Sequence, residues 1–139
     1  MSTPLRDEVE ELVTRYATAI DLRDWELFRT VFADDARIDY GPLMGSFEGG
    51  EAFTAFMKAA HAGAGRSIHR MTNIVLQPGV GIASRTYGDS IILNAADETT
   101  GDHGAATYDD TFVRTDDGLK ISSRLASIVL YEPISGNRA

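Results

Sequence analysis

The chain has 139 residues, a length that suits one domain with one contiguous core, and we expect that domain to span residues 1–139. Its net charge of −8 argues against nucleic acid and anionic membranes as partners, because both require a basic surface. The absence of cysteine excludes disulfides and thiol chemistry, and no apolar run approaches the roughly 18 residues that span a membrane. With no secretory signal visible in the N-terminal segment, we expect a cytoplasmic protein.

Two helices are expected at the start of the chain. Across residues 3–21 the apolar side chains recur at spacings of three and four, which is typical of an amphipathic helix. Ser2 or Thr3 is expected to cap this helix, and Asp24 is expected to cap a second, short helix over residues 25–32.

A short strand containing Ile38 and Tyr40 follows, and then a third helix over residues 51–61. Beyond this helix the apolar residues alternate with the period of two that β-strands show, and Asp117-Gly118 is a strong hairpin signal. Four strands are expected, at residues 67–77, 81–95, 104–114 and 119–131. Helices followed by an antiparallel meander predict an α+β fold, with the helices on one face of a curved sheet and a cone-shaped cavity at one end.

The stretch RSIHRMTNI places a histidine, His69, in the first of the long strands. Because residues in a strand alternate between its faces, His69 shares a face with Met71, Asn73 and Val75. If that face is the concave one, the imidazole points into the cavity. The alternative is a structural histidine that hydrogen-bonds a neighbour and takes no part in chemistry.

Asp21 lies at the C-terminal edge of the first helix, where the helix dipole disfavours negative charge. An adjacent imidazole would justify a carboxylate there, because the carboxylate holds the ring in one tautomer and stabilises it when it takes up a proton. A pair of Asp21 and His69 in a dry pocket would be a proton-abstracting base. The alternative is that Asp21 only caps the turn, as Asp24 can.

Three further polar residues can accompany this pair. Tyr16 lies on the inner stripe of the first helix, Tyr40 lies in the short strand, and Arg124 lies on the last long strand. Each has a structural alternative, because buried tyrosines often fill space and make one hydrogen bond. Arg124 can likewise pair with Asp109 or Asp110 across the sheet.

Cofactor and metal signatures are absent from the sequence. It contains no glycine-rich dinucleotide or phosphate-binding motif and no nucleophile-elbow motif. His61, His69 and His103 lie in separate elements, with His103 in an expected loop, so we expect neither a metal site nor a cofactor. The feasible chemistry is acid–base work on a substrate that supplies its own activation.

Four segments carry a resemblance to a known family: YATAIDLRDW, FADDARIDY, HRMTN and YDDTFVRTDDGLKISSR. Over residues 5–131 the chain resembles the SnoaL-like branch of the nuclear transport factor 2-like superfamily. This resemblance implies an α+β cone in which three helices pack on a strongly bent antiparallel sheet.

Within that superfamily the chain is most similar to the group of scytalone dehydratase, bile-acid 7α-dehydratase and hexachlorocyclohexane dehydrochlorinase. These enzymes use an Asp–His dyad, which the resemblance places at Asp21 and His69. Tyr16 and Tyr40 match tyrosines that bind substrate in the bile-acid enzyme, and Arg124 matches an arginine of several members. The chain departs from the dehydrochlorinase, which has a lysine where Tyr16 stands, and it lacks a counterpart of the second histidine of scytalone dehydratase.

The resemblance implies a cofactor-independent lyase, of the dehydratase or dehydrohalogenase type, for a small hydrophobic cyclic substrate such as a steroid or polyketide. His69 would abstract a proton, Asp21 would orient His69, and the tyrosines or Arg124 would bind the departing group or an oxyanion. An isomerase like ketosteroid isomerase, a polyketide cyclase and a non-catalytic binding module of the same fold are the alternatives. The pocket is expected to include Trp25, Phe53, Met57 and Met71, together with Phe32, Phe56 and Val75.

One face of a curved sheet in a chain of this size needs cover. We therefore expect a homo-oligomer, with a trimer favoured over a dimer because relatives that carry the dyad form trimers.

Overall fold

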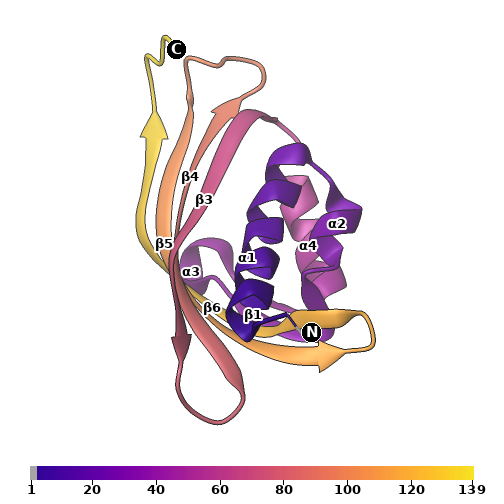
Figure 1. The fold of residues 1–139 in the computed structure, drawn as a ribbon. Coiled ribbons are helices and arrows are strands. Elements are labelled where there is room, and N and C mark those ends of the chain that lie inside the picture. The colour runs from indigo at the N-terminus through magenta and orange to yellow at the C-terminus, as the bar shows by residue number, and fades with distance from the viewer. Residues whose placement is uncertain (1–2) are drawn as a thin grey trace.

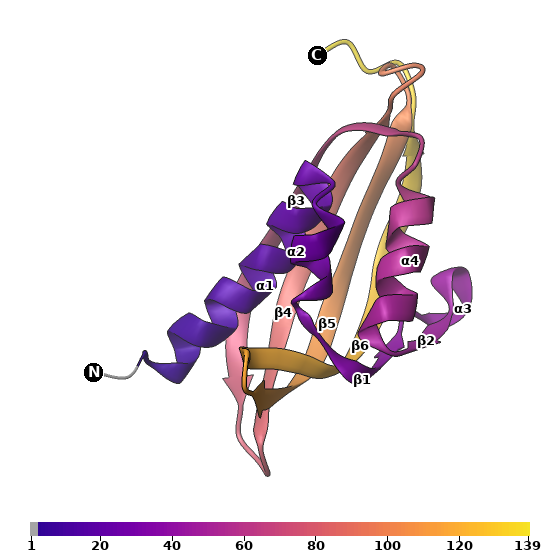
Figure 2. The same cartoon turned by 90° about the vertical axis from the view of Figure 1, so that its right-hand side faces the viewer.

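The computed structural model describes residues 3–139, and its long strands form a bent sheet with helices on the concave face (Figure 1). Figure 2 shows α1, α2 and α4 lying together in front of that face. The helices of the described residues are α1 (Leu5–Leu22), α2 (Trp25–Arg29), α3 (Gly41–Met44) and α4 (Gly50–Ala60). The strands are β1 (Phe32–Asp39), β2 (Ser46–Glu48), β3 (Ala64–Gln77), β4 (Ile82–Asn94), β5 (Gly101–Thr115) and β6 (Gly118–Ile134).

The strands form one sheet in the order β2-β1-β6-β5-β4-β3. Neighbouring strands are antiparallel except β1 and β6, which run parallel and place Ile38 opposite Arg124. Helices followed by a long antiparallel meander confirm the predicted α+β cone. The parallel pair is not among the predictions, because nothing local in β1 indicates a partner so distant along the chain.

Helix α1 begins at Leu5, and Pro4 takes its N-cap position without a side-chain hydrogen bond. The predicted cap by Thr3 is therefore wrong, and Ser2 lies outside the described residues. The apolar stripe of the helix is buried as its spacing predicts, and each large side chain contributes about 1.5–3 kcal/mol by burial. The buried residues are Val9, Leu12, Val13, Tyr16, Ala17, Ala19 and Ile20.

Helix α2 has the predicted cap, because the Asp24 carboxylate accepts a hydrogen bond of 3.0 Å from the Leu27 N–H. The helix ends at Arg29 rather than at Phe32, which instead begins β1. The Ile121 N–H donates to the Val31 carbonyl, so the chain joins the sheet at this point. Pairing with β6 thus outweighs the apolar helical spacing.

Strand β3 contains a bulge at Asn73, whose φ of +54° lies in the left-handed region. The pairing of β3 with β4 shifts register between Thr72 and Val75, so one extra residue enters β3. An extra residue inverts the alternation of faces. Val75 is therefore exposed and Ile74 packs against the core, so the prediction that Asn73 and Val75 share the face of His69 is wrong.

The predicted hairpin between β5 and β6 is confirmed. Thr115 pairs with Gly118 across a two-residue turn, and the φ of +103° at Gly118 suits a residue without a Cβ. Strand β5 begins at Gly101, so His103 lies in a strand and not in the expected loop. There its Nδ1 lies 3.3 Å from a Glu132 carboxylate oxygen.

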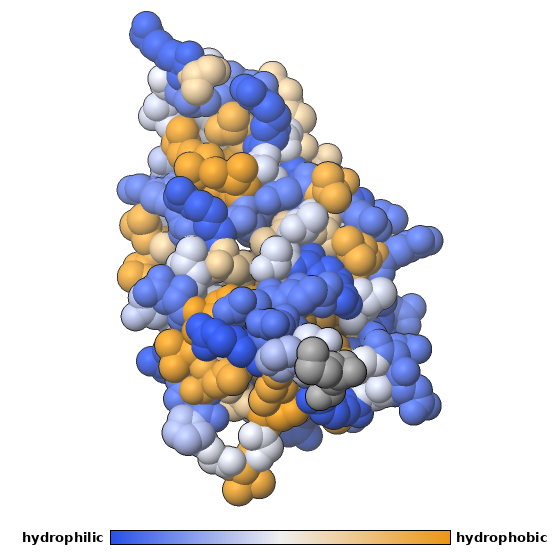
Figure 3. Space-filling view, viewed as in Figure 1, coloured by the Kyte–Doolittle hydropathy of each residue, from blue (hydrophilic) through white to orange (hydrophobic). Residues whose placement is uncertain are grey.

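On the face that Figure 3 shows, most of the surface is polar, with apolar side chains among the polar ones along the side that the sheet forms. Several exposed apolar residues follow or precede, along a strand, a residue that is buried or lines the concave side of the sheet, and they therefore lie on the convex face. They are Ile68, Tyr87, Val113, Leu125 and Val129. Across residues 3–139 the structure has no helix with the length and apolar character needed to cross a membrane.

Candidate active site

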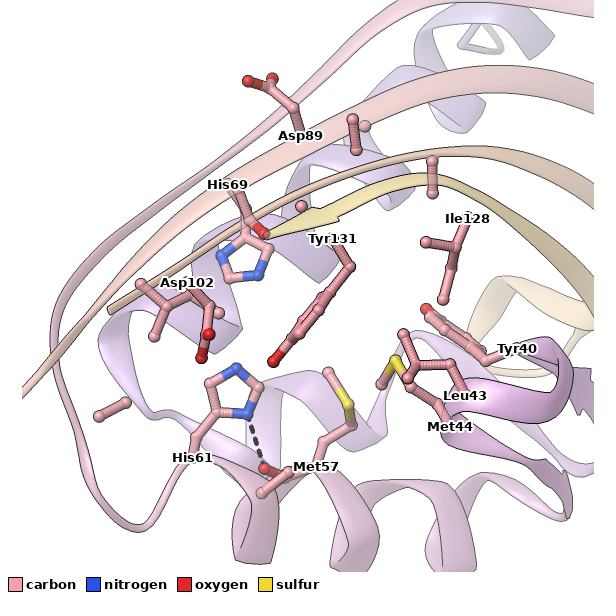
Figure 4. A pocket seen from close by; sticks show the side chains of 18 of the residues that line it. Tyr40, Leu43, Met44, Met57, His61, His69, Asp89, Asp102, Ile128 and Tyr131 are labelled. Atoms are coloured by element: carbon pink, nitrogen blue, oxygen red, sulfur yellow. Dashed lines mark hydrogen bonds between the residues drawn. The ribbon is translucent and has the colours of Figure 1, made fainter. Parts of the chain in front are cut away.

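A cavity of about 430 Å³ lies between the concave face of the sheet and α1, α3 and α4. Its volume is in the range of small-molecule sites. Figure 4 shows the polar groups of His61, His69 and Asp102 at one end, and Leu43, Met44 and Ile128 towards the other. A ligand that fits this cavity has a polar end and an apolar body.

The two residues of the predicted dyad lie in contact, Asp21 in the last turn of α1 and His69 in β3. One Asp21 oxygen accepts from His69 Nδ1 at 2.7 Å and from the Ser67 hydroxyl at 2.7 Å. The other oxygen accepts from the His69 backbone N–H at 2.8 Å. Three hydrogen bonds therefore fix the carboxylate against the strand.

These hydrogen bonds determine the charge of Asp21 and the tautomer of His69. Burial opposes ionisation of Asp21, but the hydrogen bonds from His69 and Ser67 outweigh it and lower the pKa of the carboxyl group. An ionised carboxylate only accepts hydrogen bonds, so His69 carries its proton on Nδ1 and its neutral ring has a free lone pair on Nε2. The side chain of His69 is 9% exposed and its ring points into the cavity (Figure 4).

Arg23 is a support for the dyad that the sequence reasoning missed. It follows α1 with a φ of +56°, and its guanidinium donates to the Ile20 and Gly65 carbonyls at 2.7 and 2.6 Å. It also donates to the Ser67 hydroxyl at 3.0 Å, which in turn donates to Asp21. The position of a cationic residue at the C-terminus of a helix could have indicated Arg23 from the sequence, because a cation there satisfies the last carbonyl groups and offsets the helix dipole.

Tyr16 and Tyr40 both line the cavity, and their hydroxyl oxygens lie 2.7 Å apart. Burial, together with the nearby Tyr40 and Tyr108 hydroxyls, raises the pKa of Tyr16 well above its ordinary value. Tyr16 is therefore a neutral phenol at neutral pH, and it is available as a hydrogen-bond donor.

Arg124 is 2% exposed and does not line the cavity. Its guanidinium makes a two-pronged pair with the Asp110 carboxylate at 2.8 and 2.9 Å, lies 4.3 Å from the centre of the Tyr16 ring and donates to the Tyr40 hydroxyl at 3.2 Å. Burial disfavours the cation, but the Asp110 charge outweighs it and raises the pKa of Arg124. The structure therefore replaces the expected substrate contact with the alternative, a cross-strand pair, while Asp109 pairs with Arg85.

The predicted apolar contacts divide into two groups. Met57, Met71 and Phe56 line the cavity. Trp25 and Phe53 do not, because Trp25 packs on Phe28 and His61 while Phe53 is fully buried among core aromatic rings. Phe32 and Val75 are also outside the lining. An inward helical stripe predicts burial but does not tell the packed core from the cavity wall.

Several lining residues are absent from the predictions, chiefly because they lie on α3 and on the far ends of β5 and β6. His61 ends α4 and faces the cavity, and its residue type was the only local signal. Other lining residues that the sequence reasoning missed include Leu43, Met44, Asp102, Tyr108, Ile128 and Tyr131. Among residues 3–139 no three His, Asp or Glu side chains gather in a way that could hold a metal ion.

Comparison with known proteins places this geometry in a family. The sequence profile of the SnoaL-like domain matches residues 1–125. No curated protein sequence gives a significant match.

Solved structures with the same fold are numerous, and three illustrate them. Kfla4162 from Kribbella flavida superposes with a TM-score of 0.81 at 24% identity, over 91% of this chain and 92% of its own. A hexachlorocyclohexane dehydrochlorinase, LinA type 2, gives 0.80 at 19% identity, over 96% and 91%. A scytalone dehydratase-like protein from Novosphingobium aromaticivorans gives 0.81 at 19% identity, over 96% and 94%. At these identities the likeness establishes the fold alone.

Proposed function

The chain belongs to the SnoaL-like domain family, and we propose that it is a cofactor-independent lyase that acts on a small ring compound. The observation that carries this proposal is the His69 imidazole, whose Nδ1 is 2.7 Å from an Asp21 oxygen and whose ring lines the cavity. Two of the structural neighbours, a hexachlorocyclohexane dehydrochlorinase and a scytalone dehydratase-like protein, support a reaction of this class.

The first step is removal of a proton from a carbon acidified by a neighbouring carbonyl or leaving group. The C–H electron pair forms a C=C bond, the proton goes to Nε2 of His69, and Asp21 stabilises the imidazolium that results. The leaving group departs with its bonding electron pair, as halide or as hydroxide. Hydroxide takes the proton back from His69 and leaves as water, which restores the base, whereas after loss of halide His69 releases its proton to solvent.

The two tyrosines supply a hydrogen bond to the charge that develops on the substrate. Tyr16 and Tyr40 have two phenolic protons and use one in the hydrogen bond between them, so the other can be donated to the neighbouring Tyr108 hydroxyl or, once substrate binds, to a substrate oxygen. Arg124 acts behind them, since its hydrogen bond to Tyr40 strengthens the phenol as a donor. Arg124 is thus a positioning residue in this scheme.

The test is a turnover screen of wild type and His69→Ala with hydroxysteroids, hydroxylated polyketide ketones and halocyclohexanes, read by product mass. A product lighter by one water or one hydrogen halide, formed by wild type and lost in His69→Ala, is the expected result. His103→Ala is the matched control, because His103 also lies beside a carboxylate on the sheet but outside the cavity lining. A product of unchanged mass would identify an isomerase, and turnover by His69→Ala at the wild-type rate would refute the role of the base.

We also propose that the chain forms a homo-oligomer through the convex face of the sheet. Ile68, Tyr87, Leu125 and Val129 are between 48% and 75% exposed there, and association of copies removes such apolar surface from water. A trimer remains the favoured state. Light scattering after size-exclusion chromatography should give a multiple of the chain mass for wild type and a lower mass for Leu125→Lys with Val129→Glu. A wild-type protein that elutes as a monomer would refute this assembly.

A further inference from the structure

A second imidazole, that of His61, lines the same cavity and is not used in the elimination described above. Its Nδ1 lies 2.8 Å from the Met57 carbonyl oxygen. A carbonyl oxygen only accepts hydrogen bonds, so Nδ1 carries the proton and the neutral ring has its lone pair on Nε2. Nε2 is buried and has no hydrogen-bond partner among the described residues. Buried acceptors are rarely left unpaired in proteins, so this nitrogen calls for an occupant.

His61 is not equivalent to His69, because the groups that surround the two rings differ. The Nδ1 of His69 faces a carboxylate that stabilises the imidazolium, whereas the Nδ1 of His61 faces a neutral carbonyl. Burial lowers the pKa of His61. The Met57 carbonyl and the Asp21 charge oppose this shift, whereas the Arg23 charge, and that of His69 when it is protonated, reinforce it. His61 is therefore neutral at neutral pH and its Nε2 accepts a hydrogen bond.

The position of His61 determines where its partner must lie. The centroids of the His61 and His69 rings are 6.2 Å apart, so one small ligand can contact both. Asp102 of β5 and Tyr131 of β6 line the same end of the cavity, and Figure 4 shows all four side chains gathered there. The acceptor thus lies beside the base and away from the apolar end.

We propose that Nε2 of His61 accepts a hydrogen bond from a hydroxyl group of the substrate, and that it thereby selects hydroxylated ring compounds over halogenated ones. The inference deepens the proposed lyase, whose site it shares. A hydroxyl group donates a proton to this lone pair, whereas a halogen at the same place has none to donate and leaves the buried nitrogen unpaired.

The hydroxyl that His61 holds is not the leaving group. Departing hydroxide must gain a proton, and a nitrogen that accepts a hydrogen bond cannot supply one. His61 is therefore a specificity residue, which orients the ring through a second hydroxyl while His69 removes the proton. The substrate class that fits is a ring compound with at least two oxygen substituents, one that leaves and one that stays.

The experiment uses ligands that bind without reacting. Dihydroxynaphthalenes are aromatic and have no water to lose, so calorimetry can compare each isomer with the matching fluoronaphthol in which one hydroxyl is replaced. Wild type should bind at least one dihydroxynaphthalene about fivefold to tenfold more tightly than its fluoro partner, which is the effect of one net hydrogen bond in a buried site.

Two substitutions at His61 separate its two nitrogens. Asn places an amide near Nδ1, so His61→Asn can keep the bond to Met57 while it removes the acceptor at Nε2, and the hydroxyl preference should disappear. Gln reaches the position of Nε2, so His61→Gln should restore part of the preference. His103→Asn, outside the cavity lining, should bind as wild type does.

The inference is overturned if His61→Asn keeps the wild-type preference, or if wild type prefers no dihydroxynaphthalene over its fluoro partner. The readout does not depend on turnover. A protein that shows the preference but eliminates nothing in the mass screen therefore refutes the lyase and retains the role of His61. A protein that eliminates water but shows no preference for the hydroxylated ligand supports the lyase and refutes the role of His61.

Discussion

Replacing Asp21 by Asn tests the dyad most directly, because the carboxylate accepts hydrogen bonds at both oxygens and Asn can accept at only one. If the amide oxygen faces His69 Nδ1, the amide NH₂ group faces the His69 backbone N–H, which is also a donor. If the amide is turned the other way, NH₂ faces Nδ1 and favours the tautomer with its proton on Nε2. The first orientation therefore loses the hydrogen bond from the backbone N–H, and the second leaves Nε2 of His69 protonated, so that it cannot accept a proton from the substrate.

The magnitude follows from the bond that is lost. A hydrogen bond to a charged group contributes about 1.5–3 kcal/mol, and each 1.36 kcal/mol in the barrier is tenfold in rate. Asp21→Asn should therefore lower kcat by about 10- to 150-fold, with a larger loss if the other tautomer becomes dominant. The substrate KM should change little, because Asp21 itself does not line the cavity.

Two assays check this reasoning. Product mass with the substrate found in the screen gives kcat, and ¹⁵N NMR of the imidazole identifies which nitrogen of His69 carries the proton, with no substrate needed. Wild type should show the proton on Nδ1. A wild-type proton on Nε2, or an Asp21→Asn enzyme with the wild-type kcat, would contradict the assignment of His69 as the base.

The same residue affects stability in acid, and three other sites give further predictions. Because folding lowers the pKa of Asp21, the ionised carboxylate contributes its full stabilisation above the ordinary pKa of 3.8 and loses it as the pH falls through the lower folded pKa. The free energy of unfolding of Asp21→Asn, measured in urea, should therefore depend less on acid pH than that of wild type. An equal dependence in the two proteins would contradict this. Arg124→Met should lower the free energy of unfolding by about 3–5 kcal/mol, because it leaves the buried Asp110 carboxylate unpaired. Adding Asp110→Asn should recover part of that loss, and a double variant no more stable than Arg124→Met would argue against the pair of Arg124 and Asp110. The φ of +54° at Asn73 is strained for a β-branched residue, so Asn73→Val should destabilise the fold by about 1–2 kcal/mol whereas Asn73→Gly should be tolerated. Thermal unfolding measures both, and equal melting temperatures of the two variants would refute the bulge. The preference for hydroxylated ligands should be present at neutral pH and vanish as the pH falls through the lowered pKa of His61, because a protonated Nε2 donates a hydrogen bond instead of accepting one. Calorimetry at two pH values checks this, and a preference that persists in acid would contradict the role of His61 as an acceptor.

The sequence alone determined the order and type of most elements. The apolar spacing in α1, the cap at Asp24, the alternation in the long strands and the hairpin near Gly118 are local patterns, which report on contacts within one element or across one turn. The position of Asp21 at the end of a helix and of His69 in a strand was enough, with the resemblance to a family, to predict their contact. These features depend on residues close in sequence or on a pattern shared by relatives.

Tertiary structure decided the features that depend on how distant segments pair. The parallel pairing of β1 with β6 ends α2 early and brings Ile38 opposite Arg124. One extra residue at Asn73 inverts the faces of β3 beyond His69 and Met71, an effect that strict alternation cannot anticipate.

The cavity is also a feature that tertiary structure decided. A buried guanidinium needs an anion, but only the register of β5 and β6 determined that Asp110 and not a ligand supplies it to Arg124. Likewise only the packing of α4 against the sheet leaves Nε2 of His61 buried inside the cavity, without a hydrogen-bond partner among residues 3–139. Local sequence patterns specify which face of an element is apolar, whereas the space left between packed elements, and the polar atoms that face it, arise only when those elements come together.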